Sequence, residues 1–390
     1  YKAYEPAELV NRIQPEELMV LMFTSGTTGR SKGVMLCERN FFAVMPHHVR
    51  VGQRFCQLKN DPDLLVSHMT LLPMFHLGAF GCLFTWAWMG WAQNLGSLRS
   101  FYKDLKRMPS QDMAAVPVLV QSIHHDLMTG KQDKLGDLWA LNCMSAMFDP
   151  QTLMDLHDHG MVISQLYGST ETTGGGLINF AEDAKHIGSI GKDDGHCEIK
   201  LDNGELCMRG GDVMLGYYKD PKGTAEVIDA DGWFHTGDAG YFKNGQLFLT
   251  ERIKDLFKTS NGKYIAPQAL ETKLVIDRYI DQIAIIADQR KFVSALIVPV
   301  YGFVKDYAKE KGIEYKDMAE LLQHPKIVGL FRARIETLQQ QFAHYEQIKR
   351  FTLLPEPFSM ERGELTNTLK LKRSVVSENY KELIEKMYEE

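Results

Sequence analysis

The stretch FTSGTTGRSKGV, at residues 23–34, constrains this chain more than any other part of its sequence. It follows a short apolar run and gathers hydroxyl side chains, glycines and the cation of Lys32 within a few positions. A strand, a glycine-rich loop and a helix N-terminus form a common phosphate site, because the loop offers backbone N–H groups and the helix adds a partial positive charge. We expect the strand at Leu18–Phe23 and the helix to begin near Glu38 or Asn40. The pattern therefore predicts a phosphate-binding loop in an α/β domain.

The loop is not a Walker A motif. Ser31 stands where that motif has the glycine before its lysine, and Gly33 follows Lys32 where a serine or threonine would bind magnesium. A loop rich in serine, threonine and glycine is often a plain surface turn, but T-S-G-T-T-G-x-x-K-G-V is far more specific than a turn requires. The candidate phosphate ligands are Thr24, Ser25, Gly26, Thr27, Thr28, Gly29 and Lys32.

Composition excludes several classes of protein. The chain has 390 residues, 44% of them hydrophobic and 24% charged, which is ordinary for a globular protein and enough for two or more domains. A net charge of −6 provides no basic field for nucleic acid. The six cysteines show no CxxC spacing, and scattered reduced thiols indicate a cytoplasmic protein. The apolar run Gly78–Trp91 is shorter than the roughly 18 residues of a spanning helix, so we expect a buried helix, with peripheral membrane contact as the alternative.

A second polar turn, YGSTET at residues 167–172, follows another apolar run. A strand that ends in a glycine turn suits a nucleotide site. The ring of Tyr167 can stack on adenine, the Thr170 hydroxyl can bond phosphate, and the Glu171 carboxylate is a hard oxygen ligand for Mg²⁺. The alternative is a strand followed by an ordinary polar loop, which the glycines at 174–176 would also fit.

These motifs resemble those of the adenylate-forming enzymes, the superfamily that includes acyl-CoA synthetases, firefly luciferase and the adenylation domains of peptide synthetases. LPMFH at residues 72–76 and GWFHTGD at 232–238 add to the resemblance. It implies that the loop wraps the β- and γ-phosphates of ATP, that His76 lies beside the acyl carboxylate, and that Asp238 accepts hydrogen bonds from both ribose hydroxyls. A satisfied core histidine is the alternative for His76. The turn residues assigned to the nucleotide are Tyr167, Gly168, Ser169 and Thr170.

The last third of the chain carries motifs that the resemblance assigns to a mobile domain. It implies that Arg252 contacts ribose, that Lys254 is the hinge, and that the face from Lys258 to Tyr264 turns toward the site for thioester formation. GELTNTLKLKR at residues 363–373 places the family's catalytic lysine at Lys370. An ammonium there would offset the charge that grows on the reacting oxygens.

Two positions depart from the family's usual pattern. Leu369 stands where a glycine usually precedes the lysine, a departure shared with long-chain acyl-CoA synthetases, and the phrases KTSNGKYIAPQ and LTNTLKLKR resemble that branch most. Residues 141–148, LNCMSAMF, replace a Gly-Gly-Ala-like turn that borders adenine and acyl group in relatives. Basic clusters are usually solvated, and we expect this of Lys372 and Arg373.

The resemblance implies a layered α/β large domain at residues 1–253 and a smaller, mobile α+β domain at 254–390. Only some 20 residues precede the phosphate loop, so the chain is expected to lack the family's N-terminal segment. Local signals predict further elements: an Asn-Gly hairpin within 241–249, a helix opened by Pro267, strands at 283–287 and 292–300, helices between 304 and 348, and a charged surface helix at 378–390.

The expected activity is that of an AMP-forming acid–thiol ligase that uses ATP, Mg²⁺ and coenzyme A. Its small-molecule partner is a carboxylic acid, and the two phrases above favour a long-chain fatty acid. Because no carboxylate stands at 79–80 or 141–148, an amino acid is disfavoured. The alternatives are an aryl-acid ligase, an acyl-AMP ligase that loads a carrier protein, and a non-catalytic nucleotide-binding module. The oligomeric state stays open.

Overall fold

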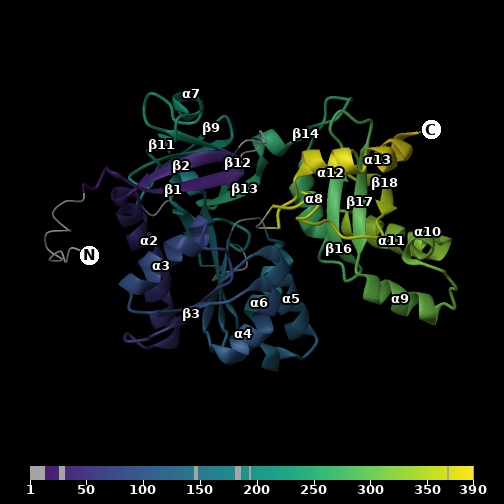
Figure 1. The fold of residues 1–390 in the computed structure, drawn as a ribbon, viewed down its shortest axis with the longest axis horizontal. Coiled ribbons are helices and arrows are strands. Elements are labelled where there is room, and N and C mark those ends of the chain that lie inside the picture. Colours follow the sequence, from purple (N-terminus) through teal and green to yellow (C-terminus); the bar gives the residue numbers. More distant parts are fainter. Residues whose placement is uncertain are drawn as a thin grey trace, which may run out of the picture. The chain divides into compact units, whose positions relative to one another are not determined.

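The computed structural model describes residues 14–25, 31–144, 148–180, 186–192, 195–366 and 369–389, apart from the side chains of Ser25, His47, Glu251 and Lys254. The chain divides into two compact units, Tyr1–Leu249 and Thr250–Glu390. In Figure 1 the first unit runs from purple to green and the second from green to yellow.

A six-stranded sheet forms the centre of the first unit, in the order β4-β3-β5-β6-β7-β8. Neighbouring strands are parallel, except that β8 runs antiparallel to β7. Helices connect the parallel strands, because parallel neighbours need a long crossover between them. The strands are β3 (Ser67–Thr70), β4 (Ala92–Leu95), β5 (Asp112–Ala115), β6 (Ala140–Cys143), β7 (Val162–Gly168) and β8 (Gly176–Asn179).

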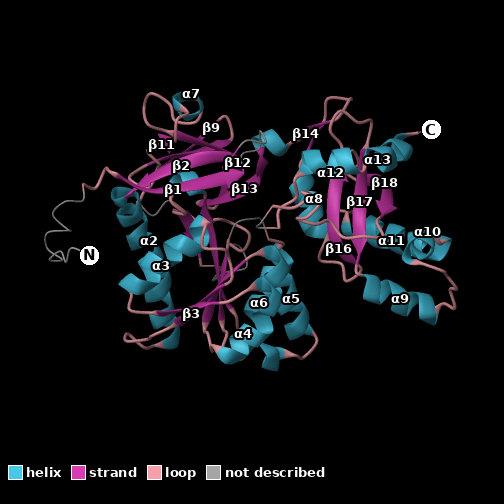
Figure 2. Cartoon of the chain, in the orientation of Figure 1, coloured by secondary structure: helices cyan, strands magenta, loops and turns pink. Residues whose placement is uncertain are grey.

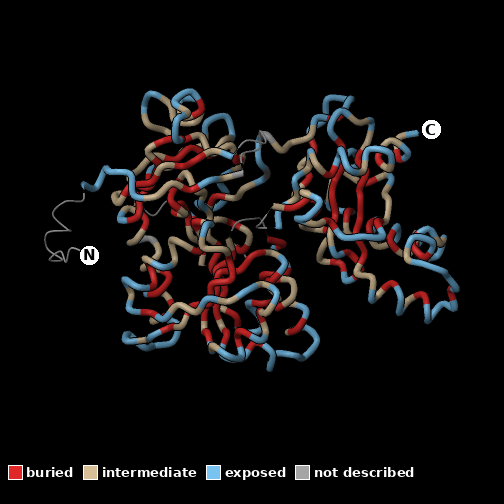
Figure 3. Tube along the Cα trace, in the orientation of Figure 1, coloured by how far each residue is buried: buried red, intermediate tan, exposed pale blue. Residues whose placement is uncertain are grey.

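Helices cover both faces of this sheet. Figure 2 shows α2 and α3 on one side of its strands and α4, α5 and α6 on the other. Both faces are therefore buried, which Figure 3 shows as red tubes at the centre of the unit. The helices are α2 (Glu38–Lys59), α3 (Leu77–Trp88), α4 (Phe101–Arg107), α5 (Pro117–Met128) and α6 (Pro150–Asp158).

The first unit also contains two smaller sheets that carry the sequence motifs. One has the order β1-β2-β11 and the other β13-β12-β10-β9. The predicted hairpin is confirmed: Asn244 and Gly245 both have positive φ and connect β12 to β13, as an Asn-Gly turn requires. The elements are β1 (Leu18–Ser25), β2 (Ser31–Cys37), β9 (Glu198–Asp202), β10 (Glu205–Arg209), β11 (Gly216–Tyr217), α7 (Pro221–Ala225), β12 (Phe234–Lys243) and β13 (Gln246–Arg252).

The second unit is an α+β fold built on the three-stranded sheet β16-β17-β18. Successive residues of β17 belong to different cores, Ala295 and Ile297 to one and Leu296 and Val298 to the other, because side chains alternate across a strand. Both faces are thereby covered by helices. The elements are β14 (Phe257–Lys258), β15 (Tyr264–Ile265), α8 (Pro267–Leu274), β16 (Ile280–Ile286), β17 (Val293–Pro299), α9 (Tyr301–Glu310), α10 (Met318–Gln323), α11 (Pro325–Leu338), β18 (Ile348–Leu353), α12 (Arg373–Asn379) and α13 (Lys381–Tyr388).

Most local predictions for the second unit are confirmed, since Pro267 opens α8 and the strands β16 and β17 lie where they were expected. The strand β18 was not predicted. It pairs in parallel with β17, from Val293↔Ile348 to Ile297↔Leu353, so its conformation depends on a distant partner. The terminal helix α13 is not simply a surface helix, because Ile384 and Met387 are buried in a core.

The prediction that Arg373 is solvated is wrong. Its guanidinium binds both carboxylate oxygens of Glu271 on α8, at 2.5 and 2.7 Å. The Glu271 carboxylate also accepts a hydrogen bond from the backbone N–H of Ile285 on β16. Lys372 is exposed, as expected. Arg373 therefore ties α12 to α8 in the described part of the second unit.

The apolar run expected to be a buried helix forms α3. Its residues Leu77, Ala79, Thr85 and Trp86 are buried, whereas Trp88 is 66% exposed. Among the described helices, none combines the length and the apolar character needed to cross a bilayer.

Candidate active site

The phosphate-loop motif forms a hairpin in this structure. The strands β1 and β2 are antiparallel, and Thr24 faces Lys32 while Ser25 faces Ser31 across the two arms. Gly26, Thr27, Thr28 and Gly29 lie between these arms and outside the described residues. The two strands therefore fix Thr24, Ser25 and Lys32 at one end of the hairpin.

The predicted start of the helix is confirmed, because α2 begins at Glu38, whereas the strand that precedes it was not predicted. The seven residues of β2 intervene between loop and helix. Their backbone groups pair with β1 and β11, which holds them extended. The macrodipole of α2 acts within its first turn, so it contributes little at the loop, and the positive charge at the described hairpin comes from Lys32.

Tyr217 joins this hairpin to the second motif. The Lys32 ammonium lies 4.3 Å from the centroid of the Tyr217 ring, a cation–π contact. The phenol of the same residue donates a hydrogen bond of 3.0 Å to Oε1 of Glu171. A cation of the phosphate hairpin and a carboxylate of the YGSTET turn thus lie on either side of one tyrosine. Sequence reasoning assigned no chemistry to Tyr217, because only the pairing of β11 with β2 brings it there.

A cavity opens beside this tyrosine. Its volume is about 280 Å³. Residues of β1, β2 and the segment that begins with β11 line it. The Lys32 side chain is among them, so an anionic ligand in the cavity would meet a cation. The lining residues are Phe23, Ser31, Lys32, Gly33, Tyr217, Tyr218 and Asp220.

The YGSTET turn is held by its own backbone. β7 ends at Gly168, and Thr170–Thr172 form a short 3-10 helix in which the Ser169 N–H donates to Oγ1 of Thr172 at 3.0 Å. A Cβ at Gly168 would lie 2.7 Å from the carbonyl oxygens of Gly174 and Gly175, a clash with backbone. Glycine is therefore required at position 168, and the turn presents Glu171 in a defined orientation.

Asp238 joins the same site from β12. The phenol of Tyr167 donates a 2.7 Å hydrogen bond to Oδ2 of Asp238, which is 8% exposed. The Asp238 backbone N–H in turn donates to Oγ1 of Thr236. A carboxylate oxygen has two lone pairs, so Asp238 can accept this phenol and still accept hydroxyl donors from a diol.

Glu205 positions the strand that carries Asp238, a role that sequence reasoning missed. Its carboxylate accepts the Gly237 N–H at 2.9 Å and contacts Nδ1 of His235 at 3.0 Å. The thiol of Cys207 lies 3.5 Å from the same His235 nitrogen. Burial and the Glu205 carboxylate raise the pKa of Cys207 to about 11, which keeps this thiol protonated at neutral pH.

His76 caps a helix close to the YGSTET turn. Its Nδ1 accepts the Gly78 N–H at 3.1 Å, so it serves as the N-cap of α3. The following residue, Leu77, would lie 3.6 Å from a Cβ placed on Gly174. The carboxyl ends of parallel strands meet at one edge of a sheet, and ligands bind there in open α/β folds. His76 and Glu171 both follow such ends, whereas Ser145–Met147, which follow β6, lie outside the described residues.

The remaining predicted residues belong to the second unit, so their place relative to Glu171 stays a prediction. Arg252 and Lys258 are exposed, and the side chain of the proposed hinge, Lys254, is not described. Lys370 is also exposed, and its backbone N–H donates to Oγ1 of Thr366 at 3.0 Å. Leu369, where the family usually has glycine, has φ 61°. Glycine adopts that conformation without steric cost.

The chain matches two family models. The model of the AMP-binding enzyme covers residues 2–218, and that of the AMP-binding enzyme C-terminal domain covers 254–390. Two curated relatives are peroxisomal long chain acyl-CoA synthetase 7 of Arabidopsis thaliana, 28% identical over 97% of this chain, and long-chain-fatty-acid–CoA ligase 5 of Mus musculus, 28% identical over 96%. The chain spans about three fifths of these relatives, 62% and 63%.

Solved structures share the fold. O-succinylbenzoate coenzyme A synthetase from Bacillus subtilis, solved with ATP and magnesium ion, superposes with a TM-score of 0.69 at 21% identity. That match covers 93% of this chain and 70% of the other. The expected fold class, a layered α/β domain followed by a smaller α+β domain, is thereby confirmed.

Proposed function

This chain belongs to the AMP-binding enzyme family, and on that premise we propose that it activates a carboxylic acid with ATP and transfers the acyl group to coenzyme A. The observation that carries the proposal is the contact series Lys32–Tyr217–Glu171, which joins the phosphate hairpin to the YGSTET turn. The Tyr167–Asp238 hydrogen bond supports it, since it adds a buried carboxylate from a third motif.

Each part of this cluster has chemistry that suits one part of a nucleotide. Lys32 and the hydroxyls of Thr24 and Ser25 bind the β- and γ-phosphates, to which a cation and neutral donors are complementary. The ring of Tyr167 stacks on adenine. Asp238 accepts the ribose hydroxyls beside its bond to the Tyr167 phenol. The full set of proposed nucleotide ligands is Thr24, Ser25, Gly26, Thr27, Thr28, Gly29, Lys32, Tyr167, Gly168, Ser169, Asp238 and Arg252.

The residues present also fit a magnesium ion at Glu171. Mg²⁺ takes oxygen ligands from one or two carboxylates together with substrate phosphates. The Tyr217 phenol orients the Glu171 carboxylate through Oε1. A bound ion would offset the negative charge of the phosphates. Glu171 and Thr170 then lie beside the triphosphate, from the same 3-10 helix.

The reaction proceeds in two steps. A carboxylate oxygen of the acid attacks the α-phosphorus of ATP, the bond to the bridging oxygen breaks, and pyrophosphate leaves. The thiol of coenzyme A then attacks the acyl carbon, loses its proton to solvent, and AMP leaves. Lys370 stabilises the charge of the first step, His76 borders the carboxylate, and the second unit turns about Lys254 so that the Lys258 face serves the second step.

The proposed acid is a long-chain fatty acid. The two curated relatives named above are long-chain acyl-CoA synthetases or ligases by name. Leu369 replaces the glycine that is usual in the superfamily, a departure that the resemblance associates with long-chain acyl-CoA synthetases. An aryl acid, a carrier-protein acceptor and a nucleotide-binding module without turnover are the alternatives.

Acid-dependent ATP–pyrophosphate exchange tests the proposal across a panel from acetate to palmitate and benzoates. We expect the highest exchange with long-chain acids and a loss of about 100-fold or more in Lys370→Ala. The matched control, Lys372→Ala, changes an exposed neighbour and should retain exchange. Exchange with benzoates alone would contradict the fatty-acid proposal. ATP binding without exchange for any acid would contradict ligase activity altogether.

A further inference from the structure

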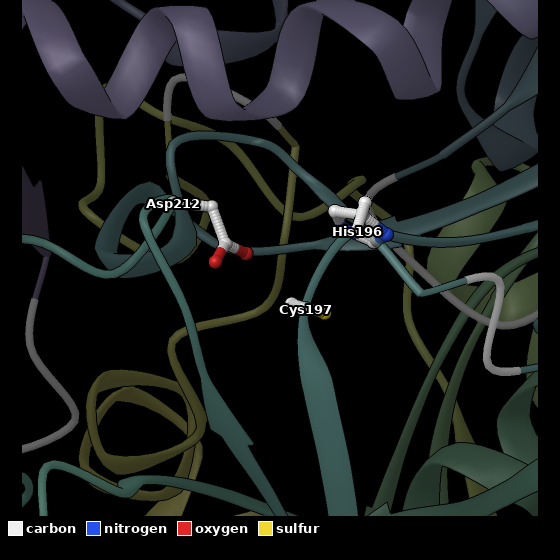
Figure 4. Close-up of side chains that lie close together, drawn as sticks. All are labelled: His196, Cys197 and Asp212. Atoms are coloured by element: carbon white, nitrogen blue, oxygen red, sulfur yellow. The ribbon is translucent and has the colours of Figure 1, made fainter.

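A cluster of three metal-ligand side chains, none of which is assigned to the nucleotide above, lies in the first unit. One donor atom each of His196, Cys197 and Asp212 lies within 4.8 Å of the others. Figure 4 shows the Asp212 side chain across a short gap from His196 and Cys197. His196 and Cys197 directly precede β9, whereas Asp212 follows β10. The antiparallel pairing Arg209↔Glu198 places the start of β9 beside the end of β10, which explains why these three residues lie together.

The burial of Asp212 is only partly compensated by its surroundings. The residue is 0% exposed, and neither carboxylate oxygen accepts a hydrogen bond from another residue in the described part of the chain. Burying an unpaired carboxylate is costly, so such groups are normally paired or bound to a metal. Burial raises the pKa of Asp212, and the nearby side chains of His196 and Arg39 act against that rise.

The backbone makes room for this cluster. A Cβ on Gly210 would lie 2.6 Å from Oδ1 of Asp212 and 3.1 Å from Cβ of Cys197. Any other residue at position 210 would therefore push the Asp212 carboxylate and the Cys197 side chain apart. Glycine permits the close approach of two side chains that are both buried.

A second cluster, also of one histidine, one cysteine and one carboxylate, provides an internal contrast. Donor atoms of Glu205, Cys207 and His235 also lie within 4.8 Å of one another. They hydrogen-bond among themselves, however, and Glu205 accepts the Gly237 N–H as well. That carboxylate is satisfied by the protein alone, whereas the Asp212 carboxylate lacks such donors among the described residues.

We propose that His196, Cys197 and Asp212 bind a zinc ion. One nitrogen, one sulfur and one carboxylate oxygen are ligands that Zn²⁺ accepts, with water in the fourth tetrahedral position. Zinc–ligand bonds of this kind place donors roughly 3.3–3.8 Å apart, so a modest inward movement from the observed spacing closes the site. Binding releases the thiol proton to solvent. The ion with one carboxylate, one thiolate and a neutral imidazole is then electrically neutral, which removes the buried charge.

The position of the site gives the ion a structural role. The backbone oxygen of Asp212 accepts the Thr173 hydroxyl at 2.7 Å, and the Met214 N–H donates to the backbone oxygen of Glu171 at 2.8 Å. The segment after β10 therefore holds the YGSTET turn. Zinc at Asp212 fixes this segment to the start of β9.

Metal content, cobalt spectroscopy and thermal unfolding of the protein test this site. The expected content is about one zinc per chain, with cobalt substitution producing a thiolate charge-transfer band. Loss of a residue that only supports a metal ligand weakens metal binding roughly 10–100-fold. Asp212→Asn, which keeps the shape of the side chain, and Cys197→Ser each alter a ligand itself, so each should weaken zinc binding by more than that. Chelation should lower the melting temperature of the wild type and leave that of Asp212→Asn unchanged.

The matched control is Cys207→Ser, a change of a second buried cysteine in the contrasting cluster. It should retain both zinc and the cobalt band. The proposal is overturned if the wild type binds no stoichiometric zinc and melts alike with and without chelator, which would leave Arg39 and His196 as the charge partners of Asp212. Retention of the cobalt band in Cys197→Ser would equally overturn it.

Discussion

Tyr167 and Asp238, 71 positions apart in the sequence, are joined by a 2.7 Å hydrogen bond from phenol to carboxylate. Tyr167 lies next to the end of β7 in the six-stranded sheet, and Asp238 lies on β12 of a smaller sheet. The bond therefore fixes two motifs of the proposed nucleotide site to each other, inside a single compact unit.

Tyr167→Phe should weaken ATP and AMP binding by about 3–10-fold, the equivalent of one hydrogen bond of roughly 0.5–1.5 kcal/mol. The ring still stacks on adenine, but the Asp238 carboxylate loses the group that orients it. Tyr167→Ala should weaken binding further, because stacking on an aromatic ring contributes roughly 1–3 kcal/mol per base. Titration calorimetry measures both. Tyr241→Phe is the control, because Tyr241 is 46% exposed and lies on β12, the strand that carries Asp238. Equal affinities of Tyr167→Ala and the wild type would exclude adenine stacking.

Tyr217→Phe separates the two contacts of that residue. The ring remains over the Lys32 ammonium, but Glu171 loses its phenol donor. We expect the magnesium concentration that half-saturates ATP binding to rise roughly 10-fold or more, as for loss of an outer partner of a metal ligand. Tyr218→Phe, at a neighbour 44% exposed, should leave it unchanged. An unaltered magnesium requirement in Tyr217→Phe would mean that Glu171 does not bind the ion.

His68 and Asp112 make stability depend on pH. Burial lowers the pKa of His68, but the Asp112 carboxylate, 2.6 Å from Nδ1, outweighs it and raises the pKa from 6.5 to about 9. The pKa of His68 is higher in the folded than in the unfolded protein. The stabilisation of the folded state by this ion pair is therefore fully present below pH 6.5 and is lost as the pH rises through about 9. It amounts to roughly 3 kcal/mol.

Urea unfolding at about pH 6 and about pH 10 measures this contribution. The wild type should lose more stability over that interval than His68→Asn, whereas His125→Asn, at an exposed position, should behave as wild type. If His68→Asn does not fold, the wild-type proton uptake on folding, measured between these pH values, gives the same answer. An equal loss in wild type and His68→Asn contradicts the ion pair.

Arg373→Ala should destabilise the second unit by about 1.5–3 kcal/mol, since it removes charge-assisted hydrogen bonds to a carboxylate. Glu271 is largely buried and would keep only the Ile285 N–H as a described partner. Lys372→Ala, at the exposed neighbour, should stay within about 0.5 kcal/mol of wild type. Denaturant unfolding followed by circular dichroism compares the two, and equal midpoints would assign the Arg373–Glu271 contact no net stabilisation.

Local patterns predicted the elements that local chemistry determines. Asn244-Gly245 forms its hairpin, and Pro267 opens α8. The family, read from the ordered motifs, is also confirmed. The features that were missed depend on partners distant in the sequence. Tyr217 reaches Lys32 through the pairing of β11 with β2, and Arg373 meets Glu271 across 102 positions. No periodicity or spacing encodes such contacts, because they form only when the sheets assemble.

The phosphate loop illustrates the same limit. Its residue types identified the motif and the start of α2 at Glu38, but the strand β2 between them was not predicted. Pairing with β1 and β11 decides that conformation. The roles of Lys258 and Lys370 remain predictions of the resemblance.

Calorimetric titration with Mg·ATP and with AMP tests most directly whether three motifs form one nucleotide site. Glu171→Gln and Asp238→Asn should each weaken Mg·ATP binding about 10-fold or more, since each loses a charge-assisted contact. AMP lacks the β- and γ-phosphates, beside which the proposal places magnesium, so it should distinguish the variants: Asp238→Asn weakens AMP binding and Glu171→Gln leaves it nearly unchanged. Wild-type affinity for Mg·ATP in both variants would contradict a shared site.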